Sequence, residues 1–282
     1  MIIRYLGTAA AERTPAMFCN CEVCRRAMAA GGKNIQTQSQ ALIDGELLID
    51  FSGDTWHHFM AMGRNLWDIG HVLITHSHVD HFTFESFALR CGGNAKGIKH
   101  EKLRFYTSQG VIDRLWECLR VRGNKKLDKI PERIEFIPME YYKPFTVADI
   151  TVTPLPAEHA GDEEAYLFLL EKGGKTIFYG NDTGFFGEEI DAYLVEQGKH
   201  IDLLSLDCTK GDNPYTYKTH MSMEEGSRIA ARFAAKGLID EKTKRYFTHF
   251  CHNSGMIRDE LAAVAKEKYG FEATYDGCEV EF

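Results

Sequence analysis

The sequence predicts an α/β protein in which strands and helices form layers. Residues 104–106 and 134–137 are expected to be strands on either side of an amphipathic helix over residues 108–122, an alternation typical of layered α/β domains. Of the 282 residues, 44% are hydrophobic and 26% are charged, as in soluble globular proteins with an ample core. The chain shows no internal repeat, linker or low-complexity segment. We therefore expect a single domain over residues 1–282.

Periodicity and turn residues predict the other elements. Strands are expected, in chain order, at residues 1–7, 40–50 (a hairpin that turns at Asp44 and Gly45), 72–74, 104–106, 134–137, 145–153 (a second hairpin), 166–171, 175–179, 201–206, from 245, 272–275 and 278–282. Helices are expected at residues 55–67, 82–89, 108–122, 222–235 and 262–269. Ser222 and Glu225 form a capping box at the start of the fourth helix. His57 and His58 lie in the first helix and are expected to be exposed or half-buried.

Residues 75–81, Thr-His-Ser-His-Val-Asp-His, contain three imidazoles and one carboxylate directly after an apolar run. If extended backbone continues to residue 78, His76 and His78 point to the same side and can chelate one ion, because side chains of a strand alternate. Asp80 and His81 follow where the chain should turn, so they can serve a second ion. A lone histidine is more often a surface or core residue, but four ligand-type residues at this spacing predict half of a two-metal site.

A second group of ligand-type residues lies near the N-terminus, where Cys19, Cys21 and Cys24 fall within six residues. Because we find no secretion signal, we expect these thiols to be reduced, and such a cluster suits zinc with thiolate ligands. The fourth ligand must come from elsewhere in the chain. His252 is the preferred donor and Cys251 is the competing one. We expect one structural zinc that ties the N-terminal loop to the C-terminal segment.

The run from His76 to His81 resembles the signature of the metallo-β-lactamase superfamily of hydrolases. The resemblance implies an αββα sandwich of two mixed β-sheets flanked by helices. It also implies a third ligand for each of the two ions and a carboxylate that bridges them. A further aspartate, Asp50, is expected to support the ligands without binding an ion. The implied set of active-site ligands is His76, His78, His159, Asp80, His81, Asp182 and His249.

Two divalent ions held in this way, zinc, manganese or iron, would share and activate a water for hydrolysis. The presence of both Asp80 and His81 favours the phosphodiesterases of the superfamily. The Cys-x-Cys-x-x-Cys cluster near the N-terminus, paired with His249-x-x-His252 near the C-terminus, resembles the PhnP-like phosphoribosyl 1,2-cyclic phosphate phosphodiesterases. His220 precedes a predicted helix N-terminus and falls where that family has an extra histidine, which acts as general acid or phosphate-binding group. We expect His220 and Asp80 to be catalytic.

The sequence departs from that family in two places, which leaves the substrate open. Residues 7–11 lack the further glycines usual in the first loop, and residues 92–102 are extra material. We expect a small cyclic phosphodiester, such as a phosphoribosyl cyclic phosphate or a cyclic nucleotide. The alternatives are hydrolysis of a lactone or thioester, a role like that of a pyrroloquinoline-quinone-biosynthesis relative with a similar cysteine cluster, and metal or oxidation sensing.

Net charge and hydropathy indicate which classes of binding partner to expect. A net charge of −8 argues against binding to a nucleic-acid polymer, which rests on many contacts from Lys and Arg to phosphate. No run approaches the ~18 apolar residues that a membrane span needs, so we expect a cytoplasmic protein without a membrane partner. A homodimer is compatible with the sequence. Basic clusters at residues 90–104 and 120–133 could attract an anion, although such runs are more often simply solvated.

Overall fold

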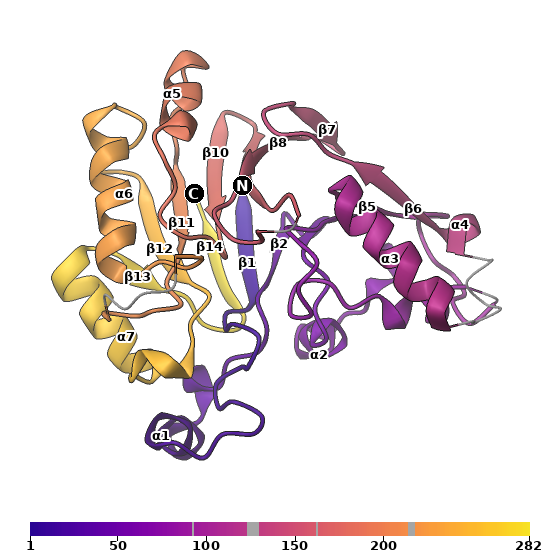
Figure 1. Ribbon diagram of the computed structural model, residues 1–282, viewed down its shortest axis with the longest axis horizontal. Coiled ribbons are helices and arrows are strands. Elements are labelled where there is room, and N and C mark those ends of the chain that lie inside the picture. The colour runs from indigo at the N-terminus through magenta and orange to yellow at the C-terminus, as the bar shows by residue number, and fades with distance from the viewer. Residues whose placement is uncertain (92, 123–129, 162, 214–217) are drawn as a thin grey trace.

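The computed structural model describes residues 1–282 except 92, 123–129, 162 and 214–217. Within these residues, two seven-stranded β-sheets pack against each other, and helices cover their outer faces (Figure 1). The order is β14-β1-β2-β3-β4-β5-β6 in the first sheet and β13-β12-β11-β10-β9-β8-β7 in the second. Both sheets contain parallel and antiparallel pairs. The expected αββα sandwich of two mixed sheets is confirmed.

The first sheet consists of β14 (Cys278–Glu281), β1 (Ile2–Gly7), β2 (Gln40–Ile43), β3 (Leu47–Ile49), β4 (His71–Leu73), β5 (Leu103–Thr107) and β6 (Ile134–Pro138). The second consists of β13 (Glu272–Ala273), β12 (Lys244–Thr248), β11 (Leu203–Asp207), β10 (Lys175–Gly180), β9 (Tyr166–Lys172), β8 (Ile150–Pro156) and β7 (Phe145–Val147). The α-helices among the described residues are α1 (Glu22–Ala30), α2 (Thr55–Ala61), α3 (Gln109–Arg122), α4 (Ile130–Arg133), α5 (Glu189–Glu196), α6 (Met223–Ala235) and α7 (Arg258–Val264).

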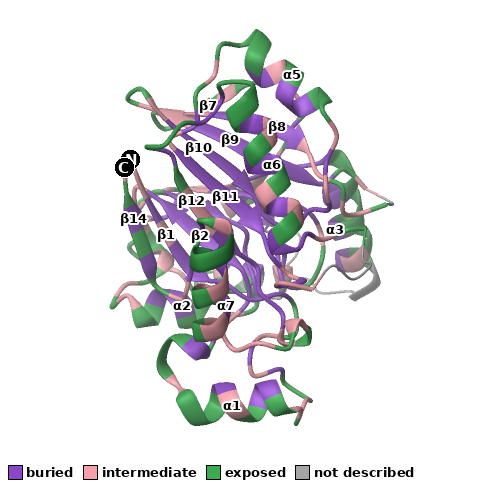
Figure 2. Ribbon diagram, turned by 90° about the vertical axis from the view of Figure 1, so that its left-hand side faces the viewer, coloured by how far each residue is buried: buried purple, intermediate pink, exposed green. Residues whose placement is uncertain are grey.

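Apolar side chains form three clusters, one between the sheets and one under each helical layer. In Figure 2 the strands of both sheets are coloured mostly as buried. Strand β9 contributes to two of these clusters, because its alternate side chains point to opposite faces. Tyr166 and Phe168 lie in the cluster between the sheets, whereas Leu167 and Leu169 pack under the helices α5, α6 and α7. This burial on both faces explains why β9 is a nearly continuous apolar run.

Several helices differ from their expected bounds. Helix α2 ends at Ala61 rather than at residue 67, because Gly63 adopts a left-handed conformation (φ 67°), and a 3₁₀ turn (Leu66–Asp68) follows. Residues 82–89 contain a 3₁₀ helix (Phe84–Leu89) in place of the expected α-helix. The capping box of Ser222 and Glu225 is confirmed at the start of α6. Helices α1 and α5 were not expected from the sequence.

The structure describes only part of the two basic clusters at residues 90–104 and 120–133. Lys125, Lys126 and Lys129 of the second cluster, and Gly92 at the start of the extra segment, lie outside the described residues. The remainder of the extra segment precedes β5 and lies against the chain after α2, where the backbone N–H of Lys99 donates to the carbonyl of Trp67. None of the helices in the described part of the chain has the length and apolar character needed to cross a membrane.

His58 is buried, which contradicts the expectation that it would be exposed or half-buried. Its Nε2 lies 2.7 Å from the Thr37 hydroxyl and its Nδ1 lies 2.7 Å from Oε1 of Gln40. The same threonine donates its backbone N–H to Asp276, which also accepts from the Thr8 hydroxyl. A polar network therefore joins α2 to the loop before β14, and polar groups that are paired in this way can be buried.

This network predicts a pH dependence of folding stability. Burial raises the pKa of Asp276 from its ordinary 3.8 to about 6, although the two threonines oppose the shift. A raised carboxyl pKa contributes stability that is fully present below pH 3.8 and is lost as the pH rises through 6, a change of up to about 3 kcal/mol. Between pH 4 and 6.5, the wild-type free energy of unfolding should therefore fall relative to that of Asp276→Asn, as measured by urea denaturation.

His58 makes the free energy of unfolding change with pH in the opposite direction to Asp276, because burial lowers the pKa of His58 to about 4. Its contribution is present above pH 6.5 and is lost as the pH falls toward 4. Both proteins retain His58, so the difference between them isolates Asp276. Parallel pH profiles of the wild type and Asp276→Asn would contradict the assignment.

Candidate metal centre

The expected ligands lie where strands of both sheets end. Strands β10, β11 and β12 are parallel neighbours, so their carboxyl ends share one edge, the usual location of ligand sites in such sheets. Asp182 follows β10, Asp207 is the last residue of β11, and His249 follows β12. In the first sheet, Asp50 follows β3 and the loop that contains His76 follows β4. The site therefore lies between the two sheets.

The first expected group comes together around the loop after β4. Nitrogen atoms of His76, His78 and His159 and an oxygen of Asp182 lie within 4.8 Å of one another. Strand β4 ends at Leu73, so the extended strand that was to align His76 with His78 does not continue to residue 78. The loop still places their ring centroids 4.4 Å apart. His159 Nδ1 lies 2.9 Å from the carbonyl of Thr219, which leaves Nε2 turned toward His78.

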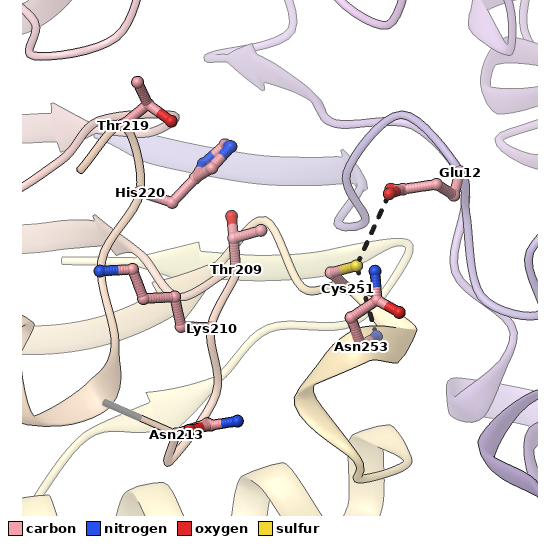
Figure 3. Close-up of a pocket in the computed structure, with 8 residues that line it drawn as sticks. All are labelled: Glu12, Thr209, Lys210, Asn213, Thr219, His220, Cys251 and Asn253. Carbon is pink, nitrogen blue, oxygen red and sulfur yellow. Dashed lines mark hydrogen bonds between the residues drawn. The ribbon is translucent and has the colours of Figure 1, made fainter. Parts of the chain in front are cut away.

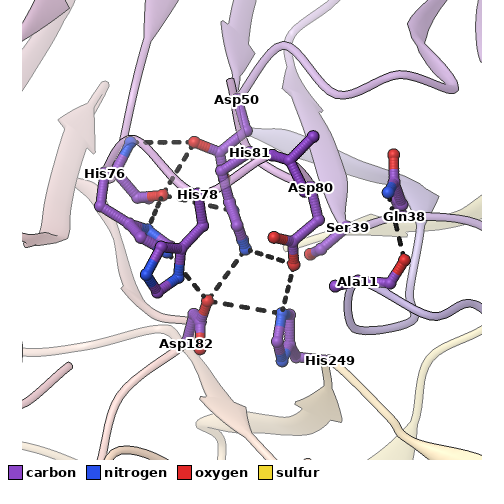
Figure 4. A network of polar contacts seen from close by, with 12 residues as sticks. Ala11, Gln38, Ser39, Asp50, His76, His78, Asp80, His81, Asp182 and His249 are labelled. Carbon is purple, nitrogen blue, oxygen red and sulfur yellow. Dashed lines mark hydrogen bonds and ion pairs between the residues drawn. The ribbon is translucent and has the colours of Figure 1, made fainter. Parts of the chain in front are cut away.

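The second expected group shares one residue with the first. Ligand atoms of Asp80, His81, Asp182 and His249 lie within 4.8 Å of one another, and all four residues are buried. Oδ2 of Asp182 lies 2.9 Å from Nε2 of His81 and 3.6 Å from Nε2 of His249, and it is 3.3 Å from Nε2 of His76 in the first group (Figure 4). Asp182 therefore occupies the position that a carboxylate bridging two cations needs.

Unpartnered polar atoms indicate that these residues fit divalent cations. The Nε2 atoms of His76, His81 and His249 are buried and have no hydrogen-bond partner among the described residues, although carboxylate oxygens lie close to them. Buried polar groups are otherwise almost always hydrogen-bonded. Imidazole nitrogen and carboxylate oxygen are the donor atoms that zinc, manganese and iron accept. The donor set and its unpartnered nitrogens therefore suit metal binding.

Electrostatics also favour positive charge here. Burial lowers the pKa of His249, but the carboxylates of Asp182 and Asp207 outweigh it and raise the pKa to about 9. His81 shows the same balance, with Asp80 and Asp50 raising its pKa well above the ordinary value. The carboxylates thus attract positive charge, either as protons on the histidines or as divalent cations, and binding of cations should release protons.

Asp50 supports the metal loop, as the resemblance implied. Its Oδ1 accepts hydrogen bonds from the backbone N–H and the hydroxyl of Thr75, both at 2.9 Å, and its Oδ2 lies 2.7 Å from Nδ1 of His81. This contact fixes the His81 ring and leaves Nε2 to face Asp182. Asp50, Asp182 and His249 all have positive φ values (67°, 52° and 61°). Non-glycine residues rarely adopt this conformation, and such backbone strain concentrates at functional sites.

His220 lies beside the two groups, just before α6. Its Nδ1 lies 3.0 Å from Oδ1 of Asp182 and 3.2 Å from Oδ2 of Asp207. Burial lowers the pKa of His220, but these two carboxylates outweigh it and raise the pKa to about 10. Sequence reasoning did not assign a role to Asp207. Its position at a strand end, like those of Asp50 and Asp182, was the available indication.

A cavity of about 300 Å³ opens next to His220 (Figure 3). Its wall includes Thr209, Lys210 and Asn253, and Glu12 lies on its far side. The Lys210 side chain is buried and its Nζ lies 3.0 Å from Oε2 of Glu225 in α6. Small-molecule sites are concave and have a few convergent polar groups. Lys210 was not singled out from the sequence.

The three cysteines of the N-terminal loop come together with His252, which lies three residues after the ligand candidate His249. The sulfurs of Cys19, Cys21 and Cys24 and a ring nitrogen of His252 lie within 4.8 Å of one another, with Cys21 Sγ 3.6 Å from His252 Nδ1. The hydrogen bond from the Cys24 backbone N–H, and then His252, lower the pKa of the Cys21 thiol to about 6. Cys251 instead faces Glu12. The structure therefore groups His252, rather than Cys251, with the three cysteines.

Comparison with known families agrees with this geometry. Residues 47–250 match the model of the β-lactamase superfamily domain. The chain belongs to this superfamily. The matched range contains every residue of the two His/Asp groups, whereas Cys19, Cys21, Cys24 and His252 lie outside it. The expected superfamily and fold are confirmed, and with them the broad class of metal-dependent hydrolases.

Solved structures with the superfamily fold cover the whole chain. A crystal structure of a diphosphatase from the PhnP family has a TM-score of 0.73 at 20% identity, covering 100% of this chain and 97% of that one. Zinc-bound PqqB from Methylobacterium extorquens also has a TM-score of 0.73, at 21% identity and 100% coverage of both chains. The short form of human tRNase Z has a TM-score of 0.61 at 18% identity, covering 100% of this chain and 99% of the other. At these identities the likeness shows the fold alone.

One curated relative matches part of this superfamily member. An octanoyltransferase from Porphyromonas gingivalis (strain ATCC BAA-308 / W83) is 28% identical over 157 residues, which are 55% of this chain. The match covers only 30% of that relative, so the chain spans less than a third of its length.

Proposed function

We propose that this chain is a dinuclear metal-dependent phosphodiesterase that acts on a small cyclic phosphodiester. The observation that carries the proposal is the pair of His/Asp groups that share Asp182, with His220 against the same carboxylate. His76, His78 and His159 would hold one ion, Asp80, His81 and His249 the other, and Asp182 both. Two divalent ions held by these residues would lower the pKa of a bound water and neutralise the charge that develops at phosphorus.

The protein groups around these ions suit an anionic substrate with an alkoxide leaving group. Nδ1 of His220 faces the carboxylates of Asp182 and Asp207, which favour the protonated imidazole, so His220 can donate a proton to the leaving group. The helix N-terminus behind it favours anions. Lys210, whose Nζ is paired with Glu225, lines the adjoining cavity, which at about 300 Å³ has the size of a site for a small molecule.

The proposal is tested by turnover of bis-p-nitrophenyl phosphate and of a panel of 2′,3′-cyclic nucleotides and ribose cyclic phosphates with added Mn²⁺ or Zn²⁺. Metal-dependent hydrolysis of at least one cyclic phosphodiester is the expected result. Failure on every phosphodiester, by protein that contains its metal ions, would reject the proposal.

Replacement of His220 separates proton donation from phosphate binding. If His220 is the general acid, His220→Ala should lower kcat on cyclic nucleotides by about 10²–10⁴-fold, because an alkoxide leaves poorly without a proton. The same variant should retain most activity on bis-p-nitrophenyl phosphate, whose leaving group needs little protonation. Equal losses on both substrates would instead identify a phosphate-binding role. His200→Ala is the matched control, because His200 is exposed and lies outside both groups.

A second candidate function is hydrolysis of an acyl ester or thioester. The name of the curated relative concerns transfer of an octanoyl group, and this match is the observation that favours the candidate. Assays with octanoyl thioesters and with lactones test it. Metal-dependent turnover of these compounds that His220→Ala leaves intact, together with no turnover of phosphodiesters, would replace the first proposal by the second.

A further inference from the structure

A second cavity lies on the outer face of the first sheet. Its wall includes Phe51, which directly follows Asp50. The cavity has a volume of about 390 Å³, and most of the residues that line it are apolar. Phe51 and Phe87 lie on its wall with ring centroids 5.7 Å apart. Neither of the His/Asp groups contributes a residue to this wall.

Large apolar side chains are exposed around this cavity. Trp56 of α2 is 70% exposed, Trp67 of the following 3₁₀ turn is 48% exposed, and Leu89 is 68% exposed, and all three line the cavity. Single exposed apolar residues are common, but three around one concave site are typical of a surface that binds an apolar group. The cavity is therefore suited to the apolar body of a ligand.

The extra segment completes the wall and adds positive charge. Lys96 and Ile98 line the cavity, as does Arg90 at the end of the preceding 3₁₀ helix. The Arg90 side chain is half-buried and donates to two carbonyl oxygens, from Nη2 to His100 and from Nε to Arg133. Its Nη1 has no hydrogen-bond partner, and no carboxylate forms an ion pair with Arg90, within the described ranges.

A half-buried guanidinium without a carboxylate partner is costly unless an anion approaches it. Burial, followed by the charge of Arg133, lowers the pKa of Arg90, in keeping with a guanidinium that has two carbonyl acceptors but no carboxylate beside it among the described residues. Lys96 is exposed, and no ion pair or hydrogen bond involves it in the described part of the chain. Arg and Lys bind carboxylates and phosphates through charge-assisted hydrogen bonds. An anionic group is thus the complement of this part of the wall.

From the apolar wall and these two cations, we infer that this cavity binds an amphipathic anion, an alkyl or aryl chain that carries one terminal carboxylate or phosphate. The chain would lie against Trp56, Trp67 and Leu89, and the anion would face Arg90 and Lys96. This site is independent of hydrolysis at the metal centre. Its wall is nevertheless connected to that centre, because Phe51 donates its backbone N–H to the carbonyl of His81 at 2.7 Å.

Binding is tested by titrating the full chain with octanoate, with octyl phosphate and with 1-octanol. Calorimetry and tryptophan fluorescence detect the binding. The chain has three tryptophans, and two of them line the cavity. Saturable binding of at least one anion is expected, more than about tenfold tighter than that of octanol. Comparing the affinities for octanoate and octyl phosphate shows whether the site prefers a carboxylate or a phosphate. The fluorescence response should persist in Trp116→Phe and decrease in Trp56→Phe.

Variants separate this cavity from the metal centre, which could itself attract an anion. Leu89→Asp should abolish binding of both anions. Lys96→Gln should weaken it several-fold and Arg90→Gln about tenfold or more, while Lys242→Gln, a control in the turn before β12 of the other sheet, should have no effect. Because Arg90 also holds two carbonyls, Leu89→Asp and Lys96→Gln test the site even if Arg90→Gln does not fold. The inference is overturned if neither anion binds saturably. It is also overturned if Asp182→Ala or inorganic phosphate abolishes binding while Leu89→Asp does not.

Discussion

Asp182→Ala is expected to lower metal-dependent phosphodiester hydrolysis by about 10³-fold or more and to reduce the number of tightly bound metal ions per chain. The carboxylate of Asp182 lies close to nitrogen atoms of five histidines. Its removal takes a ligand from both expected ions at once, and each ion supplies several kcal/mol of transition-state stabilisation. Elemental analysis of the purified protein and kcat/KM on the preferred phosphodiester measure the two effects.

The same variant also shows whether activity or folding is lost. Asp182 contacts the ligand histidines and belongs to none of the three apolar clusters, so the alanine variant should stay folded by circular dichroism while it loses metal. His200→Ala is again the control and should keep both metal and activity. A folded Asp182→Ala protein with wild-type metal content would show that the two groups do not share this ligand.

Replacement of a cysteine in the N-terminal group is expected to have the largest effect on stability. Cys19→Ala should remove one zinc per chain and lower the melting temperature by roughly 10 °C. A metal bound a thousandfold above its dissociation constant contributes about 4 kcal/mol, which corresponds to a shift of this size in a large domain. Cys19 is the preferred target because Cys21 caps α1 and Cys24 accepts a hydrogen bond from Ala16.

Metal content and thermal denaturation measure this effect in parallel. Cys118→Ala is the control, since Cys118 is half-exposed in α3 and lies outside the cysteine group. His252→Ala should match Cys19→Ala, whereas Cys251→Ala should retain the zinc. A zinc content and melting temperature unchanged by Cys19→Ala would leave the cysteines as free thiols and would favour the sensing alternative.

Four of the expected ligands, His76, His78, Asp80 and His81, could be proposed from the sequence because their spacing carries chemical meaning independent of the fold. Asp80 and His81 lie next to each other in the sequence, and Nε2 of His81 lies 3.2 Å from Oδ2 of Asp80 and 2.9 Å from Oδ2 of Asp182. His159 was a weak prediction on its own, since a single histidine at a strand end has many roles. Its position became predictable only through the resemblance to a family.

Other parts of the site depend on contacts between distant segments and were not predictable. Asp207 looks like an ordinary strand end until α6 brings His220 to within 3.2 Å of it. His58 looks like an exposed helix residue until Thr37 and Gln40 approach its ring. Helix α1 was obscured because its N-terminal cap is Cys21, and sulfur is not a usual capping group. For Asp207 and His58 the deciding partner lies in another part of the fold, whereas for α1 it is an unusual local cap.

The short segment after β12 contributes to two separate sites. His249 belongs to the His/Asp group and His252, three residues later, belongs to the cysteine group. If both groups hold ions, then any rearrangement of this segment that accompanies binding at one changes the affinity of the other. Thermodynamic reciprocity requires the two effects to be equal in size. Loss of zinc from the cysteine group would then change metal binding at the His/Asp group by the same factor as the reverse.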